Sequence, residues 1–510
     1  MDDEGARRGY WIFRLEKARI RDIFSLLFTR RTISDYDFVD SGEPAPSPLS
    51  GGDSSADFKT RSVIAVVLAV QMMLSSASGF MASLGRGIEF LLNLPSFNGG
   101  FRSLIRRLLT ASVVKPKREA KEFRSINAHL NGRLGLGQSN LAVPAQTQDG
   151  NINLIELLYL TILAASRAYE NEANVTDVVN NHWKMHFVEF YNCWNKFLKK
   201  NATKAFIFCD KAEDASLICV AFRGTELFDF ADWQTDLDIS YVSMGSSRGR
   251  VHLGFMKALG LQDAKDVVIG FPKKPPAEEN GKPLAYYAIR KKLTELGQQH
   301  PKARILITGH SLGGALAALF PALLSYHDEK AILEKIMVIP HAQPRVGDKT
   351  FSKYMMKAIG DRYLRTVYRY DLVPRVPPTS RFLNVFAHFG KCVYYTRWYA
   401  YKEVETVPNW NYFNPIYNTL MYWGAWEDLF WAFYLREGIE SVVYRFVVGI
   451  LVPIFGPGIV CHNTRNYLNG AEYAREQGRQ EEDDDGGEEL QGEDAVRGWR
   501  RIEGRDQKAM

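Results

Sequence analysis

Residues 304–318 have the sequence RILITGHSLGGALAA, in which a short apolar run meets a serine flanked by glycines and then continues into small residues. The apolar part, 304–307, predicts a buried β-strand. The run of small and apolar residues from Leu312 through Leu324 predicts a helix. Ser311 therefore lies at a strand-to-helix turn, inside the pattern Gly-x-Ser-x-Gly.

This turn is suited to present a nucleophile. Gly309 and Gly313 allow a backbone turn too tight for side chains, which leaves the Ser311 hydroxyl accessible above the sheet. Free N–H groups at the start of the helix stabilise the negative charge that develops when a serine attacks a carbonyl. We interpret Ser311 as the nucleophile rather than as part of an ordinary glycine-rich turn.

Strands and helices alternate around this turn. Two apolar runs, 205–209 and 217–222, flank a charged turn and predict a hairpin. Two more strands are predicted at 336–339 and 363–370, and helices are predicted at 152–168 and 179–198. This alternation predicts an α/β fold with a mostly parallel central sheet.

A catalytic serine needs a base, and the base needs a carboxylate that orients it. Asp371 is the best acid candidate, because it ends the 363–370 strand and precedes prolines that force the chain out of the sheet. Asp348 is the rival, although its context, Arg345-Val346-Gly347-Asp348, predicts a loop.

Two histidines compete for the role of base. His388 follows Asp371 by 17 residues and lies in an apolar, aromatic run. His462 follows a Pro/Gly turn and precedes a predicted final helix, so that a loop carrying it can reach a strand-end serine. Spacing alone favours His462 and leaves His388 open.

The oxyanion hole requires two hydrogen-bond donors near the serine. Leu312, directly after the nucleophile, supplies one backbone N–H. Thr225 closes the 217–222 strand and offers both a backbone N–H and a hydroxyl. A plain strand-ending turn is the alternative interpretation of Thr225.

These motifs together resemble those of the class 3 (fungal-type) triacylglycerol lipases, and within them the plant oil body lipases. The resemblance covers residues 60 to 470 approximately, and one departure is Pro340-His341-Ala342-Gln343, where the family usually has an aromatic-Gly-Gln run. The matching motifs are Arg223-Gly224-Thr225, Asp232-Trp233-Gln234-Thr235-Asp236, Gly309-His310-Ser311-Leu312-Gly313-Gly314-Ala315, Gln343-Pro344-Arg345-Val346-Gly347 and Asp371-Leu372-Val373-Pro374.

The resemblance implies an α/β-hydrolase fold with a Ser-Asp-His triad, in which the histidine before the last helix, His462, is the base. It implies that His388 is a non-catalytic histidine. The expected activity is hydrolysis of triacylglycerol, together with di- and monoacylglycerol, and this chemistry needs no metal or organic cofactor. A phospholipase A1 or galactolipase on the same scaffold is the enzymatic alternative, and a non-catalytic droplet-coat protein is the other.

Composition agrees with a large globular enzyme. The chain has 510 residues, of which 46% are hydrophobic and 24% charged, which excludes collagen-like, coiled-coil and wholly disordered classes. A net charge of +6 gives no reason to expect nucleic acid as a partner. The five cysteines lack metal-ligand spacing and suit an intracellular, reducing setting.

The N-terminal region, 1–130, is basic, with 19 Lys/Arg against 14 Asp/Glu. It contains 24 consecutive uncharged residues, 62–85, and then an apolar stretch bearing arginines that ends near residue 109. We expect residues 61–109 to attach the protein to a lipid droplet or to endoplasmic-reticulum membrane as an interfacial segment. A membrane-spanning helix and a buried helical hairpin are the alternatives.

The rest of the chain divides by composition. Residues 131–150 predict a linker, 151–470 the catalytic domain and 471–510 a disordered acidic tail. Residues 394–446 form an insertion in which 18 of 53 residues are aromatic. We expect it either to pack as core or to form a cap that meets the lipid, with Trp426 and Trp431 at the interface. The segment 226–250 is the other candidate for a lid.

Overall fold

The computed structural model describes residues 9–29, 31–42, 54–131, 153–260, 270–275, 282–377, 386–408, 412, 415–434, 438–452 and 454–483. The predicted linker, apart from Asn131, and the predicted tail beyond Asp483 lie outside the described residues.

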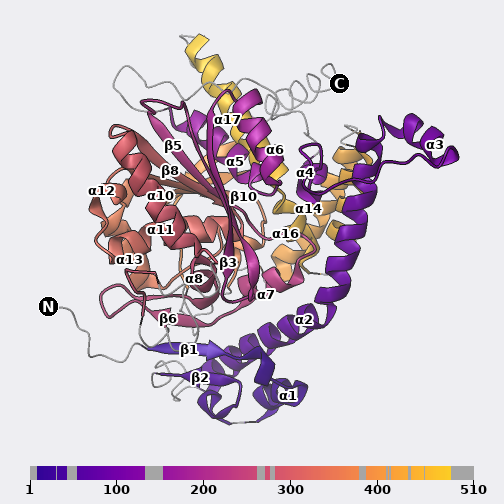
Figure 1. Ribbon diagram of the computed structural model, residues 1–510. Coiled ribbons are helices and arrows are strands. Elements are labelled where there is room, and N and C mark those ends of the chain that lie inside the picture. The colour runs from indigo at the N-terminus through magenta and orange to yellow at the C-terminus, as the bar shows by residue number, and fades with distance from the viewer. Residues whose placement is uncertain are drawn as a thin grey trace.

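An eight-stranded sheet forms the centre of the molecule (Figure 1). The strands β5, β8, β9, β10 and β11 run parallel, and β3, β4 and β12 are antiparallel strands at the two edges. This arrangement confirms the predicted mostly parallel sheet and the hairpin β4–β5. In spatial order the strands are β12 (Tyr401–Val404), β11 (Lys391–Tyr395), β10 (Leu364–Tyr368), β9 (Ile336–His341), β8 (Arg304–His310), β5 (Leu217–Phe222), β4 (Lys200–Cys209) and β3 (His186–Asn195).

Helices cover both faces of this sheet (Figure 1). On one face lie α8 (Leu253–Leu259), α10 (Ala285–Gln299), α11 (Leu312–Tyr326) and α13 (Lys349–Ala358), and on the other lie α5 (Leu154–Arg167) and α17 (Thr464–Asp483). Within β8, Ile305 and Ile307 pack into the hydrophobic core on the α11 side of the sheet, and Leu306 packs into the core on the α5 side. Because β8 is buried on both faces, its residues 305–307 form a continuous apolar run rather than an alternating pattern.

The structure differs from the sequence interpretation at two elements. The predicted helix at 179–198 is wrong beyond its first residues: η3, a π-helix (Val178–His182), follows α6 (Glu172–Asp177), and residues 186–195 then form the edge strand β3. Along β3, Tyr191, Cys193 and Asn195 are buried in alternation, which is the period of a strand. Residues 471–483 continue helix α17, where Ala471 and Ala474 are buried, so the helix extends beyond the predicted start of the tail.

The N-terminal region shares a second sheet with the catalytic region. Strand β1 (Tyr10–Phe13) pairs with β2 (Val39–Ser41) on one side and with β6 (Tyr241–Ser243) on the other, and β7 (Arg250–His252) completes the order β2-β1-β6-β7. This pairing ties the start of the chain to a segment more than two hundred residues later.

The helices of the N-terminal region follow the side of the molecule. They are α1 (Ile20–Phe28), α2 (Ser54–Phe97), α3 (Phe101–Leu109) and α4 (Ile126–Asn131). Among the described residues, α2 is the one helix long and apolar enough to cross a membrane, although a third of its most apolar window (33%) is buried against the protein. It packs on α1 and on α7 (Phe230–Leu237).

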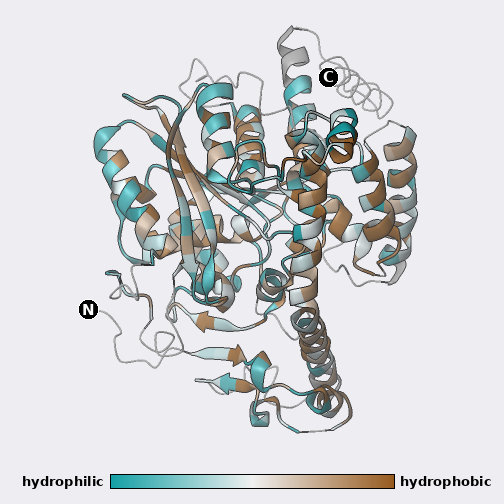
Figure 2. Cartoon of the chain, turned by 45° about the vertical axis from the view of Figure 1, so that its right-hand side comes forward, coloured by the Kyte–Doolittle hydropathy of each residue, from teal (hydrophilic) through white to brown (hydrophobic). Residues whose placement is uncertain are grey.

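The aromatic insertion forms a helical cluster that packs beside the end of the sheet. It contains α14 (Pro415–Tyr434) and α15 (Ile439–Tyr444), and α16 (Gly456–Cys461) follows it. Met421 of α14 and Tyr412 pack on Leu372 and Val376, which lie in the segment after β10. Figure 2 shows that the helices along this side of the molecule are strongly apolar.

Candidate active site

Ser311 lies at a strained turn between β8 and α11. Its φ of 62° and ψ of −130° lie outside the regions that side chains normally adopt, as expected for a serine presented on a strand-to-helix elbow. Its side chain is 1% exposed. Within the described part of the chain the Ser311 Oγ has no hydrogen-bond partner.

The glycines around this turn permit close backbone contacts. A Cβ on Gly313 would lie 2.2 Å from the Phe222 carbonyl oxygen, at the end of β5. A Cβ on Gly224 would lie 2.3 Å from the His310 carbonyl oxygen and 3.0 Å from the Ser311 Cβ. The turn that carries Thr225 therefore lies directly beside the candidate nucleophile.

Asp371 and His462 form a hydrogen-bonded pair. The His462 Nδ1 lies 3.0 Å from Asp371 Oδ1 and 2.9 Å from Asp371 Oδ2. Asp371 follows β10 and is fully buried, and His462 directly follows α16. Because the carboxylate accepts at Nδ1, the Nε2 of His462 remains the atom that can take a proton.

Two further contacts fix the Asp371 carboxylate. The Tyr467 hydroxyl donates to Asp371 Oδ2, and the Tyr368 N–H donates to that hydroxyl oxygen over 3.1 Å. The Val373 N–H donates to Asp371 Oδ1 over 2.9 Å. Burial raises the pKa of Tyr467 well above its ordinary value, so its hydroxyl keeps the proton that it donates.

The two rival residues have other partners. The Nε2 of His388 lies 2.6 Å from the Pro374 carbonyl oxygen, and its pKa is well below the ordinary value because of burial and nearby arginines. Asp348 caps the N-terminus of α13 by accepting from the Phe351 N–H over 2.7 Å. Neither residue lies in the Asp371–His462 hydrogen-bonding arrangement.

Two backbone donors are available beside Ser311. Among the described residues, neither the Thr225 N–H nor the Leu312 N–H has a hydrogen-bond acceptor. The Thr225 hydroxyl instead donates to Asp236 Oδ2 over 3.0 Å, which holds the turn in place. Thus the backbone N–H groups, rather than the Thr225 hydroxyl, are free to receive an oxyanion.

Three aromatic neighbours of the site were not singled out as site residues in the sequence. The His310 ring lies 4.5 Å from the His462 ring, and its Nδ1 is 3.0 Å from the Tyr169 hydroxyl. Burial lowers the pKa of His310 well below its ordinary value and keeps the ring neutral. The Trp233 ring meets His462 edge-on at 6.1 Å. Trp233 and His310 lie within the motifs that carry the resemblance, but the motifs did not assign them a role.

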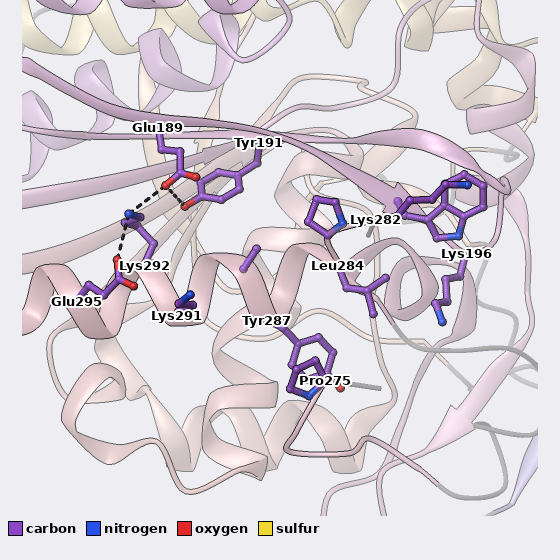
Figure 3. Close-up of a pocket in the computed structure, with 13 residues that line it drawn as sticks. Glu189, Tyr191, Lys196, Pro275, Lys282, Leu284, Tyr287, Lys291, Lys292 and Glu295 are labelled. Atoms are coloured by element: carbon purple, nitrogen blue, oxygen red, sulfur yellow. Dashed lines mark hydrogen bonds and ion pairs between the residues drawn. The ribbon is translucent and has the colours of Figure 1, made fainter. Parts of the chain in front are cut away.

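A cavity of about 340 Å³ lies elsewhere, between β3 and α10 (Figure 3). Its lining includes Lys282 and an ion-paired group in which Lys292 bridges Glu189 and Glu295. None of the candidate catalytic residues lines it.

Comparison with known proteins identifies the relatives of this chain. Residues 219–381 match the family described as Lipase (class 3), a range that includes Thr225, Ser311 and Asp371 and ends before His462. The triacylglycerol lipase OBL1 of Nicotiana tabacum is 35% identical over 479 residues, which cover 80% of this chain and 82% of that protein. OBL1 of Arabidopsis thaliana is 35% identical over 442 residues, which cover 80% of this chain and 84% of that protein.

The chain therefore belongs to the class 3 lipases and is a serine hydrolase. Within that family, its similarity to the plant enzymes named triacylglycerol lipase OBL1 extends over most of their length. A solved structure of the triacylglyceride lipase of Rhizomucor miehei aligns with 49% of this chain and 82% of that chain, with 23% identity and a TM-score of 0.36.

Proposed function

We propose that this lipase hydrolyses triacylglycerol, with Ser311 as nucleophile, His462 as general base and Asp371 as the carboxylate that orients it. The observation that carries the proposal is the pairing of His462 Nδ1 with both oxygens of Asp371, on a strand end next to the strained Ser311 turn. The similarity to plant triacylglycerol lipases supports the choice of substrate.

The residues act in two half-reactions. His462 Nε2 takes the Ser311 proton as Oγ attacks the ester carbonyl, and the Thr225 and Leu312 N–H groups stabilise the oxyanion. The C–O bond to the glycerol moiety then breaks, and His462 returns the proton to the leaving alcohol. Water attacks the acyl-enzyme in the same way, releasing a fatty acid and regenerating Ser311.

We further propose that the enzyme works at the surface of a lipid droplet or of endoplasmic-reticulum membrane, with residues 61–109 as the attachment and 151–470 as the catalytic region. The Arg61 Nε donates to the Leu26 carbonyl over 2.8 Å, and the Gln71 side chain donates to the Gln234 carbonyl over 3.3 Å. A helix that crossed a bilayer would lose these polar contacts, which supports attachment along the surface rather than a span.

One assay tests the substrate. Purified full-length protein is given emulsions of triolein, phosphatidylcholine and galactolipid under identical conditions, and the released fatty acid is titrated. We expect triolein to be hydrolysed fastest. Faster hydrolysis of either polar lipid would assign the enzyme to the phospholipase A1 or galactolipase class instead, and no release from any of them would favour a non-catalytic coat protein.

A further inference from the structure

Three buried arginines, which we call the arginine cluster, lie around the segment that follows β10. Arg365 belongs to β10, Arg345 lies between β9 and α13, and Arg375 ends the short 3-10 helix after Asp371. Arg365 and Arg375 are 2% exposed, and Arg345 is 6% exposed. An arginine is almost never buried to this extent unless a partner balances its charge, so the partners of these side chains show what the cluster can bind.

Backbone carbonyl groups hold two of the three guanidinium groups. Arg345 donates to the carbonyl oxygen of Arg375 and, over 2.8 Å, to that of Pro377. Arg375 donates to the carbonyl oxygen of Asp371 and, over 2.8 Å, to that of Pro408. These contacts fix both guanidinium groups against the loop that carries Asp371. A carbonyl oxygen accepts a hydrogen bond, but it carries no full negative charge that would cancel the charge of the arginine.

The Arg365 guanidinium has fewer partners than the other two. Its Nη2 donates to the Glu405 carbonyl oxygen over 3.3 Å, and its buried Nε and Nη1 have no acceptor among the described residues. Alternate residues of a strand share a face, so Arg365 lies on the face of β10 that carries Val367, which packs with Cys392 and Val407. A buried donor without an acceptor destabilises the folded state, and more so when it is charged.

The positive charges of the cluster oppose one another. Burial, together with the charges of Arg375 and Arg365, lowers the pKa of Arg345 to about 9. Burial also lowers the pKa of Arg375, although the Asp371 carboxylate acts in the opposite direction. Asp371 offsets only part of the charge, because its carboxylate also pairs with His462. An additional negative charge beside Arg365 would relieve this repulsion and supply the missing acceptor.

We propose that the arginine cluster binds one small oxyanion, a phosphate, sulfate or carboxylate, through the Arg365 N–H groups that lack an acceptor. Guanidinium groups form strong, charge-assisted hydrogen bonds with such anions. The bound anion stabilises the loop after β10, because Arg345 and Arg375 hold the carbonyl groups of that loop. The inference goes beyond the proposed function and does not depend on it, since anion binding and unfolding are measured without a lipid substrate.

Equilibrium dialysis of the full-length protein against radiolabelled inorganic phosphate tests the site directly. We expect one phosphate to bind per chain, and we expect Arg365→Met to lose at least about tenfold in affinity. The same dialysis with labelled sulfate and with labelled butyrate identifies the class of anion. Tightest binding of phosphate or sulfate assigns an inorganic anion, and tightest binding of butyrate assigns a carboxylate ligand. Absence of saturable binding for all three anions would overturn the proposal.

Two further variants locate the bound anion. Arg365→Lys keeps the charge but loses the planar array of donors, so its affinity should lie between those of the wild type and Arg365→Met. Lys353→Gln removes an exposed positive charge outside the cluster and should bind the anion as the wild type does. Equal affinity of the wild type and Arg365→Met would show that the anion is held elsewhere, and this result would also refute the site.

Thermal unfolding provides an independent test. At a phosphate concentration about a hundred times the dissociation constant, the melting temperature of the wild type should rise by about 3 °C and then level off. The general salt effect of phosphate on apolar burial does not saturate in this way. In phosphate-free buffer, Arg365→Met should melt no lower than the wild type, because the substitution removes a buried charge. A wild type without a saturable rise, or an Arg365→Met variant that keeps it, would contradict the proposal.

Discussion

The candidate catalytic residues Ser311, Asp371 and His462 come from three separate turns, and the Asp371 carboxylate has contacts beyond its pair with His462. The carboxylate of Asp371 receives hydrogen bonds from Tyr467 and from the Val373 N–H as well as from His462. Removal of any of these donors would leave a buried acceptor with fewer partners, which costs about 1–3 kcal/mol. The orientation of the His462 imidazole therefore depends on Tyr467 and Val373 through their contacts with Asp371.

Triad substitutions should separate the two histidines. Ser311→Ala and His462→Ala should each reduce kcat by about a million-fold, and the double variant should lose little more, because the residues act as a unit. His388→Ala should retain most activity, since His388 contacts the Pro374 carbonyl rather than Asp371. Initial rates of triolein hydrolysis measure all three. An inactive, folded His388→Ala beside an active His462→Ala would show that the base is misassigned.

At this scale, local sequence located the strand-to-helix turn that carries the candidate nucleophile, and it missed the residues that surround the candidate site. Ser311 is recognisable because its glycines, strand and helix are neighbours in the sequence. Tyr467 and Tyr169 support the site only through contacts formed by folding, across 96 and 141 residues of chain. No local pattern distinguishes such a tyrosine from one that packs in the core.

Helix α2 is fastened to the segment that follows α3 in the N-terminal region by the largely buried carboxyl group of Glu89. Glu89 pairs with Arg118 and accepts from the Ile126 N–H over 3.3 Å. Burial raises the pKa of Glu89 to about 7, and the carboxylates of Glu226 and Glu170 contribute. Since this pKa is above the value of the unfolded chain, the stabilisation from protonated Glu89 is complete below about pH 4.5 and is lost as the pH rises through about 7.

A pH series should reveal the titration of Glu89. In Glu89→Gln the site no longer titrates, so the urea midpoint of the variant should rise relative to the wild type between pH 5 and pH 8. Comparison with the wild type at each pH removes the contribution of other buried groups. Glu119→Gln, which removes an exposed carboxylate nearby, controls for net charge. A constant difference between Glu89→Gln and the wild type would rule out titration of Glu89 in this range.

Elements buried on both faces were predicted from the sequence, whereas the edge of the sheet was not. The strands β5, β8 and β9 contain short apolar runs between turns. Where such runs alternate with helical segments along the chain, they are interpreted as buried strands. Residues 186–195 mix aromatic and polar side chains, which also suits a helix. Pairing with β4 along nearly its whole length makes this segment a strand, β3, rather than a helix.

On the scale of the whole molecule, the exposed large apolar side chains of the described residues are concentrated on α1, α2, α3 and the α14 cluster. The sequence predicted an attachment segment, but it did not predict that β1 pairs with β6, because such a pairing joins distant parts of the chain. Consequently the N-terminal region does not pack separately from the catalytic region. Attachment to lipid should be tested in the full-length chain, where this sheet is intact.

The exposed residues of α3 should contribute to localisation. Full-length protein with Phe101→Ser, Leu108→Ser and Leu109→Ser should shift from droplets to the cytosol in lipid-loaded cells, because apolar contact with lipid is lost. Confocal imaging of a fluorescent fusion measures the fraction on droplets. Ser311→Ala in the same fusion should remain on droplets and serves as the control. Unchanged droplet localisation of the triple variant would exclude α3 from attachment.

The structure distinguishes the tryptophans of α14, which the sequence treated alike. Trp423 and Trp426 are 71% and 52% exposed, whereas Trp431 is half-buried against Phe430 and Tyr434. Exposed tryptophans stabilise contact with an oil–water boundary, since the ring is apolar and its N–H is polar.

Trp423→Ser/Trp426→Ser should therefore reduce triolein-emulsion activity by about tenfold, equivalent to about 1.4 kcal/mol of lost interfacial binding, and leave hydrolysis of dissolved p-nitrophenyl butyrate nearly unchanged. Trp431→Ser is the matched control, and it should lower the melting temperature and affect both substrates alike, because its ring packs against the cluster. If the double variant also lost both activities equally, these tryptophans would be packing residues, and lipid contact would fall to α2 and α3.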